Sequence, residues 1–379
     1  MVLSGIFRQF FESERAGGLV LIFCTILSIA LTNSGVVAYV DFWNIEFAGH
    51  TLVHWVNDGL MVIFFLMIGL ELKREMYSGE LSNLRNAMLP IFAALGGMIV
   101  PAGIYLAVNA NSPIGDPAGA GIPMATDIAF ALGALSLLGR RVPAVLKVFL
   151  TSLAVIDDLG AILVIAVFYT DTLSWIDLGA ALGIFAFLLL LNRLKVWSLI
   201  PYLIGGVAMW YFMLYSGIHA TITGVLLAFA IPFAAGDARN PSNLLEAFLH
   251  KPVAFGILPI FALANTCILI NAAAISGLTG PVALGIMAGL LIGKPVGITL
   301  FTILATRLRV AALAPGLRNI HIIGTGLLAG IGFTMSIFIT LLAFTDPLLI
   351  DVAKLAIVGI SLVSGVLGYI MLSRTLKMA

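Results

Sequence analysis

Charged side chains are scarce in this sequence, and their scarcity indicates the class of protein. Only 10% of the 379 residues are charged and 61% are hydrophobic, whereas a soluble domain carries about 25% charged residues. The formal net charge is +1, which excludes the basic excess typical of nucleic-acid-binding domains. We therefore expect an integral membrane protein that lies in a lipid bilayer and binds no nucleic acid.

Cysteines and long polar stretches are also few. Cys24 and Cys267 both lie inside apolar runs, which argues against a disulfide framework. The first stretch, MVLSGIFRQFFESERAGG, has acidic residues before the first apolar run and no small-residue cleavage site. We expect no removable signal peptide there. Because no polar stretch is long enough for a soluble domain, we expect residues 1–379 to form a single membrane domain.

Apolar runs fill the rest of the chain. A hydrocarbon core about 30 Å thick is crossed by roughly 20 apolar residues in a helix. The expected spans are 16–34, 53–71, 87–108, 121–138, 146–169, 175–192, 197–215, 218–234, 252–271, 281–305, 320–344 and 350–372. The predicted fold class is an all-α polytopic membrane protein with twelve transmembrane helices.

Basic residues are missing from every second connection between these spans. They gather before the first span and after each even-numbered one, at Arg8, Arg15, Lys73, Arg74, Arg85, Arg140, Arg141, Lys147, Arg193, Lys195, Arg239, Lys251, Arg307, Arg309, Arg318, Arg374 and Lys377. The positive-inside rule then places both termini in the cytoplasm. Lys354, near the outer end of the last span, can extend its ammonium group to the interface.

Four charged residues lie at membrane depth: Asp127, Asp157, Asp158 and Lys294. Each costs about 3 kcal/mol at a helix centre, so together they oppose insertion by on the order of 10 kcal/mol. An Asp–Lys pair that only ties two helices together would compensate Lys294 and one carboxylate. At least one carboxylate remains, and such a residue typically marks an ion or proton pathway.

Two of the expected spans are interrupted. In GIPMATDIAFALG, Pro123 comes shortly before Thr126 and Asp127, and in GLLAGIGFTMSIF the run is broken by Gly330 and Gly332. We interpret both spans, the fourth and the eleventh, as broken helices.

The interrupted spans are the middle members of two three-span groups, at about 87–169 and 281–372. Corresponding members are seven spans apart, so the two groups have opposite orientations in the membrane. This pattern matches inverted repeats whose discontinuous helices form an ion site near the midplane.

The segments ATDIAFALG, LAVIDDLGAI, SGIHATITG, GLLIGKPVGI and GIGFTMSIFI resemble the bacterial sodium/proton antiporter A family (NhaA type). GLELKREMYSGEL and FFESERAGG are similar as well, so the resemblance covers nearly the whole chain. It implies twelve spans in the bacterial inner membrane, with the two broken helices crossing each other. It also implies electrogenic, pH-regulated exchange of cytoplasmic Na⁺ or Li⁺ for external protons.

The chemistry of the membrane-depth residues is compatible with that activity. The oxygens of Asp157, Asp158, Asp127 and Thr126 suit a small hard cation such as Na⁺. Burial and a neighbouring carboxylate both favour the protonated form of a carboxyl group, so protons and Na⁺ compete for the same oxygens. By resemblance, Asp158 is the principal Na⁺ ligand, whereas Asp157 pairs with Lys294 and takes part in proton exchange.

Further polar residues lie near the ends of the spans. Glu71, Lys73, Arg74 and Glu75 at the end of the second span, together with Glu246 and His250 before the ninth, resemble the family's pH-sensing cluster. A solvated helix end explains these residues equally well. Ala247 stands where some relatives carry an ionisable residue.

Two residues near other helix ends have alternative interpretations. His219 either tunes the pH response or is a hydrogen-bonded histidine at a helix start. Asp58 either lines an outer funnel or caps a helix.

The loop DFWNIEFAGHT, residues 41–51, favours a short strand pair, and by resemblance such a hairpin joins two protomers into a homodimer. His50 and His54 have the spacing of metal ligands on a helix, but no third ligand accompanies them. We expect no resident metal and no cofactor.

Three other functions can be compared with antiport. An intramembrane aspartyl protease also needs two carboxylates in the bilayer, but ATD and IDD lack the GxGD-type segment of that family. A sodium-coupled symporter for an organic anion would need polar or basic groups beyond Lys294. A cation channel would conduct without proton counterflow. The sequence favours a secondary Na⁺/H⁺ antiporter rather than an enzyme.

Overall fold

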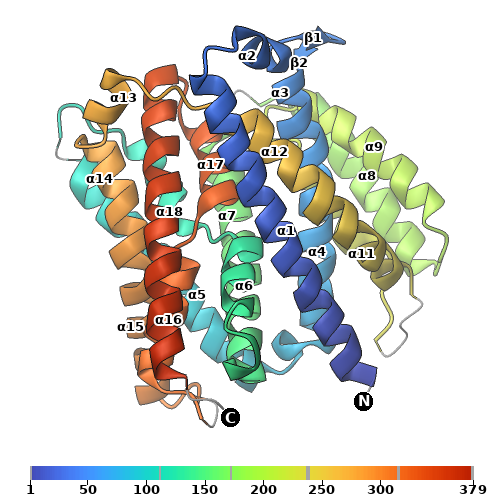
Figure 1. Ribbon diagram of the computed structural model, residues 1–379. Helices are drawn as coiled ribbons and strands as arrows, with labels where there is room; N and C mark the ends of the chain where they lie inside the picture. The colour runs from blue at the N-terminus through green and yellow to red at the C-terminus, as the bar shows by residue number, and fades with distance from the viewer. Residues whose placement is uncertain (1, 111, 171–172, 236–239, 314–315, 377–379) are drawn as a thin grey trace. The chain divides into compact units, whose positions relative to one another are not determined.

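The computed structural model describes residues 2–110, 112–170, 173–235, 240–313 and 316–376. Arg239 and Lys377, which helped to orient the spans, lie outside these ranges. Most of the described chain is helical (Figure 1). The helices are α1 (Val2–Asn33), α2 (Val37–Trp43), α3 (Leu52–His54), α4 (Met61–Ser78), α5 (Leu84–Asn109), α6 (Ile128–Ser136), α7 (Ala144–Phe168), α8 (Trp175–Arg193), α9 (Ile200–Tyr215), α10 (Ile222–Ala230), α11 (Pro241–Pro252), α12 (Leu258–Asn265), α13 (Ala272–Gly277), α14 (Pro281–Ala288), α15 (Lys294–Arg307), α16 (Asn319–Ala329), α17 (Phe333–Ala343) and α18 (Pro347–Thr375).

Several helices continue into tighter or wider turns. Within the described residues, π-helical segments join α3 to α4 at Trp55–Leu60, α11 to α12 at Val253–Ile257, and α14 to α15 at Gly289–Gly293. The 3₁₀ segments are Glu80–Ser82, Pro117–Met124 and Gly139–Arg141. Such wide turns are rare in proteins and occur frequently at functional sites.

Nine helical runs of the described chain are long and apolar enough to cross a membrane. The pair α16 and α17, bent by 51° at its break, makes a tenth. The expected spans 197–215 and 218–234 correspond to the shorter helices α9 and α10, of 16 and 9 residues. The count of twelve therefore stays a prediction.

The expected ninth span, 252–271, was placed too late in the chain. The helical run there is Pro241–Asn265, and the Asn240 side chain caps its start by accepting from the Asn243 N–H at 2.9 Å. Residues 266–271 are not helical. Hydropathy does not distinguish a helix from an extended segment, so the aliphatic run Ile268–Ile270 favoured a longer span than the structure has.

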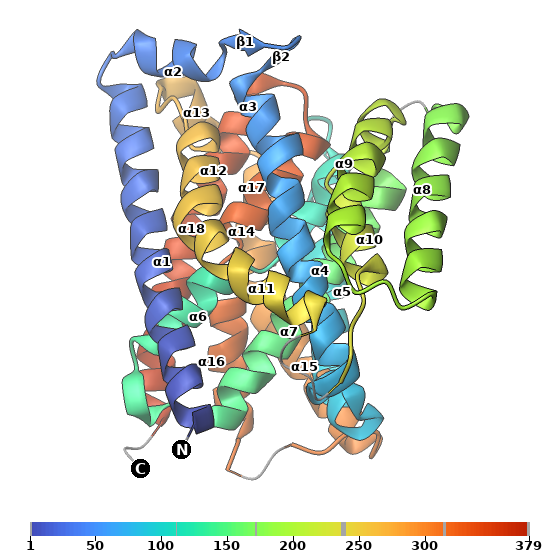
Figure 2. The ribbon, with the colours of Figure 1, turned by 90° about the vertical axis from the view of Figure 1, so that its right-hand side faces the viewer.

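The chain forms two compact units. The first comprises Met1–Gly35, Asn83–Ala161 and Asn265–Ala379. In it α5 packs along α15, α1 along α6, and α16 beside α18, which runs next to both halves of the bent pair in the two views (Figures 1 and 2). Close approach of α5 and α15 depends on glycines: a Cβ at Gly297 would lie 2.9 Å from the Cβ of Val100.

The second unit comprises Val36–Ser82 and Ile162–Ala264. Here α4 packs against α10, and α8 lies beside α9 (Figure 2). Strands β1 (Glu46–Phe47) and β2 (His50–Thr51) pair antiparallel within the expected segment 41–51, whereas the start of that segment belongs to α2. Ala48 and Gly49 have φ values of 53° and 84°, as a tight two-residue hairpin turn requires.

Candidate functional site

The polar centre of the first unit lies where two helical runs are interrupted. Between the 3₁₀ segment Pro117–Met124, which contains Pro123, and α6, residues 125–127 are extended. Between α16 and α17 the helix stops at Gly330 and resumes after Gly332. A Cβ at Gly330 would lie 3.1 Å from the Leu327 carbonyl oxygen and closer still to that of Leu290, so only glycine fits this close approach.

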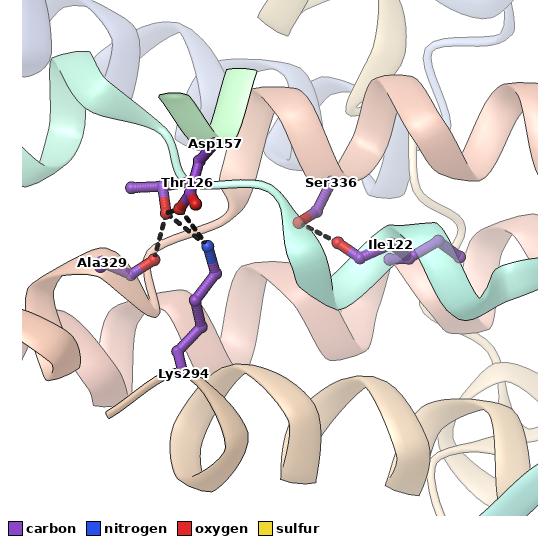
Figure 3. A network of polar contacts seen from close by, with 6 residues as sticks. All are labelled: Ile122, Thr126, Asp157, Lys294, Ala329 and Ser336. Atoms are coloured by element: carbon purple, nitrogen blue, oxygen red, sulfur yellow. Dashed lines mark hydrogen bonds and ion pairs between the residues drawn. The ribbon is translucent and has the colours of Figure 1, made fainter. Parts of the chain in front are cut away.

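Hydrogen bonds join the two breaks. The Asp127 N–H donates to the Ile331 carbonyl at 2.7 Å, and the Ser336 hydroxyl donates to the Ile122 carbonyl at 2.7 Å (Figure 3). The Thr126 hydroxyl lies 2.9 Å from the carbonyl oxygen of Ala329, the last residue of α16. Backbone N–H and C=O groups that lose their helical partners at the interruptions are thereby hydrogen-bonded inside the protein. This is required because the hydrocarbon core of a bilayer offers no water to bind them.

Lys294 reaches this centre from the start of α15. Its side chain and that of Asp157 are both fully buried, and the ammonium nitrogen lies 2.5 Å from Asp157 Oδ2. The ammonium also donates to Thr126 Oγ1 at 2.7 Å, which in turn lies 2.8 Å from Asp157 Oδ2. Figure 3 shows the three side chains converging beside Ala329. We call Thr126, Asp157 and Lys294 the buried triad.

Asp157 and Asp158 are both fully buried on α7, which is apolar on either side of them. The contacts that join Lys294 and Thr126 go to Asp157. Neighbouring helix positions point about 100° apart, so Asp158 presents its carboxylate in another direction. The two adjacent carboxylates are therefore not equivalent in their contacts, and the division of roles expected for them stays a prediction.

Protein donors occupy both carboxylate oxygens of Asp127. Oδ1 accepts from the Phe130 N–H at 3.1 Å, and Oδ2 accepts from the Thr334 N–H at 3.0 Å and from the Thr334 hydroxyl. These amides are the starts of α6 and α17, where a negative charge is favoured by the helix dipole. Asp127 thus acts as the counter-charge of two helix N-termini, and Thr334 is a partner that sequence reasoning missed.

A second polar cluster lies in the second unit. The Arg74 guanidinium pairs with Glu246 at 3.0 Å, with Glu75 at 3.5 Å and with Glu71 at 3.7 Å. The structure therefore brings together four residues from the expected pH-sensing group, on α4 and α11. His250 is one helical turn after Glu246, inside the helix rather than before it.

Lys73 does not join this cluster, although it precedes Arg74 in the sequence. Its side chain is buried, and its ammonium donates to the carbonyl oxygens of Ala228, Phe229 and Ile231 at the end of α10. A buried cation there satisfies the open carbonyls of a helix C-terminus. No sequence signal separates Lys73 from its charged neighbours.

The remaining expected residues lie elsewhere in the second unit. Asp58 is inside the π segment Trp55–Leu60 and pairs with His54 at 3.3 Å, so it does not cap a helix start. The His219 ring lies 2.8 Å from the Tyr169 carbonyl oxygen, as a hydrogen-bonded histidine would. Among the described residues no group of three or more His, Cys, Asp or Glu side chains could hold a metal ion.

The chain matches known proteins over nearly its whole length. The family model for Na⁺/H⁺ antiporter 1 matches residues 8–372. The Na⁺/H⁺ antiporter NhaA of Flavobacterium psychrophilum is 60% identical over 378 residues, covering 100% of this chain and 98% of that protein. The protein of the same name from an Escherichia coli O1:K1 strain is 48% identical over 375 residues, covering 96% of each.

A solved structure has a similar fold. The sodium proton antiporter MjNhaP1 from Methanocaldococcus jannaschii superposes with a TM-score of 0.54 and covers 99% of both chains. Because only 14% of the residues are identical, this likeness concerns the arrangement of the helices alone.

Proposed function

The chain belongs to the Na⁺/H⁺ antiporter 1 family, and from this membership and the geometry of the site we propose that it exports cytoplasmic Na⁺ in exchange for external protons. The observation that carries the proposal is the buried triad at the junction of two helix breaks, with Asp158 beside it. A charged residue at membrane depth typically marks an ion or proton pathway.

Exchange follows from competition for carboxylate oxygens. Asp158 and Asp157 supply hard oxygen ligands for Na⁺, with Asp158 as the principal one, and the same oxygens take up protons. Lys294 holds Asp157 when the site is empty and is displaced from it, or loses its own proton, when Na⁺ enters. A site that opens to one side of the membrane at a time then couples the two ions without a separate proton channel.

The finer architecture belongs to the same proposal. We infer twelve spans by counting α9, α10 and the bent pair α16–α17 with the nine long helical runs. The groups 87–169 and 281–372 form inverted repeats whose fourth and eleventh spans cross at their breaks, which the bonds from Thr126 and Asp127 to Ala329 and Ile331 support. The chain spans the bacterial inner membrane many times, with both termini in the cytoplasm.

Regulation and assembly complete the proposal. The Arg74 cluster is the pH-sensing entrance on the cytoplasmic side, with His250 beside it, and His219 and Asp58 belong to the outer side. Li⁺ accompanies Na⁺ as a transported ion, since it is a hard cation of the same charge. The hairpin of β1 and β2 is the contact through which two copies form a homodimer in the bilayer.

The test uses everted or reconstituted vesicles that contain a trapped pH dye. Na⁺, Li⁺, K⁺ and choline are added in turn across a pH series, and we expect proton movement with Na⁺ and Li⁺ only. The variant Asp158→Asn should abolish this response while remaining folded. Asp177→Asn, a carboxylate change on α8 in the second unit, is the matched control and should retain it.

The other outcomes discriminate between functions. Proton movement that persists in Asp158→Asn would overturn the site assignment. Cation flux without proton movement would indicate a channel, and the absence of any response would favour the symporter or the protease.

A further inference from the structure

A groove in the surface of the first unit runs between α1, α6 and α18, and Figure 1 shows α6 between the other two helices. Its volume is about 430 Å³. The rim includes Ile26 and Leu362, which are 63% and 70% exposed, whereas Ile331 and Phe333 in the floor are each 4% exposed. We call the cavity that these residues line the α6 groove.

The lining of the α6 groove is almost entirely hydrocarbon. Among the described residues its polar members are Thr25, Ser361 and Tyr369. The Thr25 hydroxyl donates to the Leu21 carbonyl at 2.8 Å, and the Ser361 hydroxyl accepts from the Gly332 N–H at 3.3 Å. Both hydroxyls are thus engaged within the protein. Since pockets orient polar ligands through a few well-placed polar groups, this groove suits a ligand whose buried part is apolar.

The length of the groove matches one leaflet of a bilayer. Along α18 the lining extends from Val358, near the middle of the helix, to Tyr369 near its end. These two positions are about 16 Å apart along the helix axis, and one leaflet contributes half of a hydrocarbon core about 30 Å thick. A transmembrane helix from a second copy would extend about twice as far, whereas the acyl chain of one lipid ends at this depth.

Basic side chains follow the lining residues at the end of the groove that the proposed orientation places in the cytoplasm. Arg141 comes four positions after Leu137, and Arg374 comes five positions after Tyr369. Both arginines are exposed. Within α6, the 3₁₀ segment after it and the described part of α18, the one acidic residue is Asp351, at the opposite end of α18. Guanidinium groups bind phosphate strongly, and the cytoplasmic leaflet is rich in anionic lipids.

The floor of the groove belongs to the two helix breaks. Phe130 and Phe333 line it, and their rings contact each other edge-to-face with centroids 5.0 Å apart. The Phe130 N–H donates to Asp127, and Thr334, the residue after Phe333, donates to the same carboxylate. A ligand packed on these two rings would therefore contact the helix starts that hold Asp127.

We propose that one acyl chain of an anionic phospholipid from the cytoplasmic leaflet fills the α6 groove, while its phosphate pairs with Arg141 and Arg374. The chain packs on Phe130 and Phe333 and stabilises the starts of α6 and α17. Because lipid tails are as apolar as the lining, selectivity comes from the fit of the chain and from the charge of the headgroup. The inference rests on the orientation in the membrane given under the proposed function, but the binding itself does not require antiport.

The first experiment uses phosphatidylglycerol with a diazirine near the end of one acyl chain, in vesicles that hold the full-length protein. Mass spectrometry maps the labelled residues after illumination, and we expect several-fold more label on Phe130 and Phe333 than with the matching phosphatidylcholine. Ala134→Leu, which fills the groove, should remove this label. Gly359→Leu is the control, because it adds a side chain at an exposed position of α18 where a Cβ would meet nothing within 4 Å.

The headgroup is tested by combining Arg141→Gln with Arg374→Gln. This variant should label to the same extent with both lipids, because the guanidinium groups that prefer the anionic one are gone. Both changes are at exposed positions, so they test the proposal even if Ala134→Leu does not fold.

The second experiment measures hydrogen exchange of amides 330–334 in phosphatidylcholine vesicles with and without phosphatidylglycerol. We expect the anionic lipid to slow this exchange several-fold in the unmodified protein and in Gly359→Leu, but not in Ala134→Leu. Equal labelling by the two lipids, label that persists in Ala134→Leu, or cross-links between two copies at these residues would overturn the proposal. Neither readout needs transport, so a failure of antiport in the pH-dye assay is a separate result.

Discussion

Thr126 has one hydroxyl proton and two acceptors within reach. Its Oγ1 lies 2.8 Å from Asp157 Oδ2 and 2.9 Å from the Ala329 carbonyl oxygen, while Lys294 donates to the same atom. A hydroxyl donates one hydrogen bond at a time. When Asp157 is ionised the proton can turn toward it, and when Asp157 is protonated its own O–H can donate to Thr126, which then turns to Ala329. We infer that the protonation state of Asp157 decides whether Thr126 donates to Asp157 or to the Ala329 carbonyl at the end of α16.

Replacing Thr126 tests this arrangement. Thr126→Val keeps the shape and removes the hydroxyl, which leaves Asp157 and Lys294 without one partner. Losing a hydrogen bond to a charged group costs about 1.5–3 kcal/mol, so the apparent Na⁺ affinity should change by roughly tenfold or more. Na⁺ titrations in vesicles measure this change. Thr126→Ser retains the hydroxyl and should stay close to the unmodified protein, and equal behaviour of the two variants would contradict the role.

Lys294 is expected to stabilise the protein as well as to serve in exchange. Its removal leaves Asp157 buried without its cation, and breaking a buried pair costs about 3–5 kcal/mol. Lys294→Ala should therefore lower the Tm in detergent by roughly 4–6 °C. Combining Lys294→Met with Asp157→Asn should cost less than the sum of the two single changes, because neither charge is then left alone. An unchanged Tm in Lys294→Ala would count against a structural pair.

At the scale of the elements, irregular helical turns occur next to the polar residues. Lys294 directly follows the π segment Gly289–Gly293, and Asp58 lies inside the π segment Trp55–Leu60. The wide turn before Lys294 changes the direction of its side chain relative to α14, and the break after Ala329 frees the carbonyl that Thr126 approaches. The site is thus built by departures from regular α-helix rather than by regular surfaces.

The close contact of α5 and α15 supports the position of Lys294. A Cβ added at Gly297 would lie 2.7 Å from the Gly96 carbonyl carbon, whereas a Cβ added at Gly103 would meet nothing within 4 Å. Because overpacking costs about 1–3 kcal/mol, we expect Gly297→Ala to lower the Tm by several degrees. Gly103→Ala, on the lipid-accessible part of α5, should leave it unchanged or raise it slightly. Thermal scans in detergent compare the two, and equal values would contradict the packing argument.

A feature could be predicted from the sequence where its cause is a local property of the residues, and not where its cause is a tertiary contact. Pro123, Gly330 and Gly332 predicted the helix interruptions, because proline and glycine change the backbone conformation locally. The carboxylates stand out because charge is expensive in a bilayer. The partners of a charge are set by tertiary contact, so neither the bond from Thr334 to Asp127 nor the burial of Lys73 could be predicted.

Boundaries and special turns were also beyond prediction. A π segment changes only the hydrogen-bond register and leaves no mark in composition, and α11 begins before the apolar run that suggested the ninth span.

At the scale of the whole molecule, the balance of charge in the site determines what drives transport. With both Asp157 and Asp158 protonated, Lys294 leaves the site one positive charge. With both ionised and one Na⁺ bound, the same site is neutral. If two protons replace one Na⁺ in each cycle, one net charge crosses the membrane. A potential of 100 mV then supplies about 2.3 kcal/mol to the exchange.

This charge count predicts Na⁺ extrusion driven by voltage alone. Proteoliposomes loaded with Na⁺ at equal internal and external pH are given an interior-negative potential by K⁺ and valinomycin. Since 2.3 kcal/mol corresponds to a concentration ratio of roughly 50, we expect Na⁺ to leave against a gradient of up to about that size at 100 mV. The same vesicles without valinomycin, and vesicles with Asp158→Asn, should not extrude Na⁺. Efflux that ignores the potential would mean that one proton replaces one Na⁺, so that only one of the two aspartates changes its protonation in each cycle.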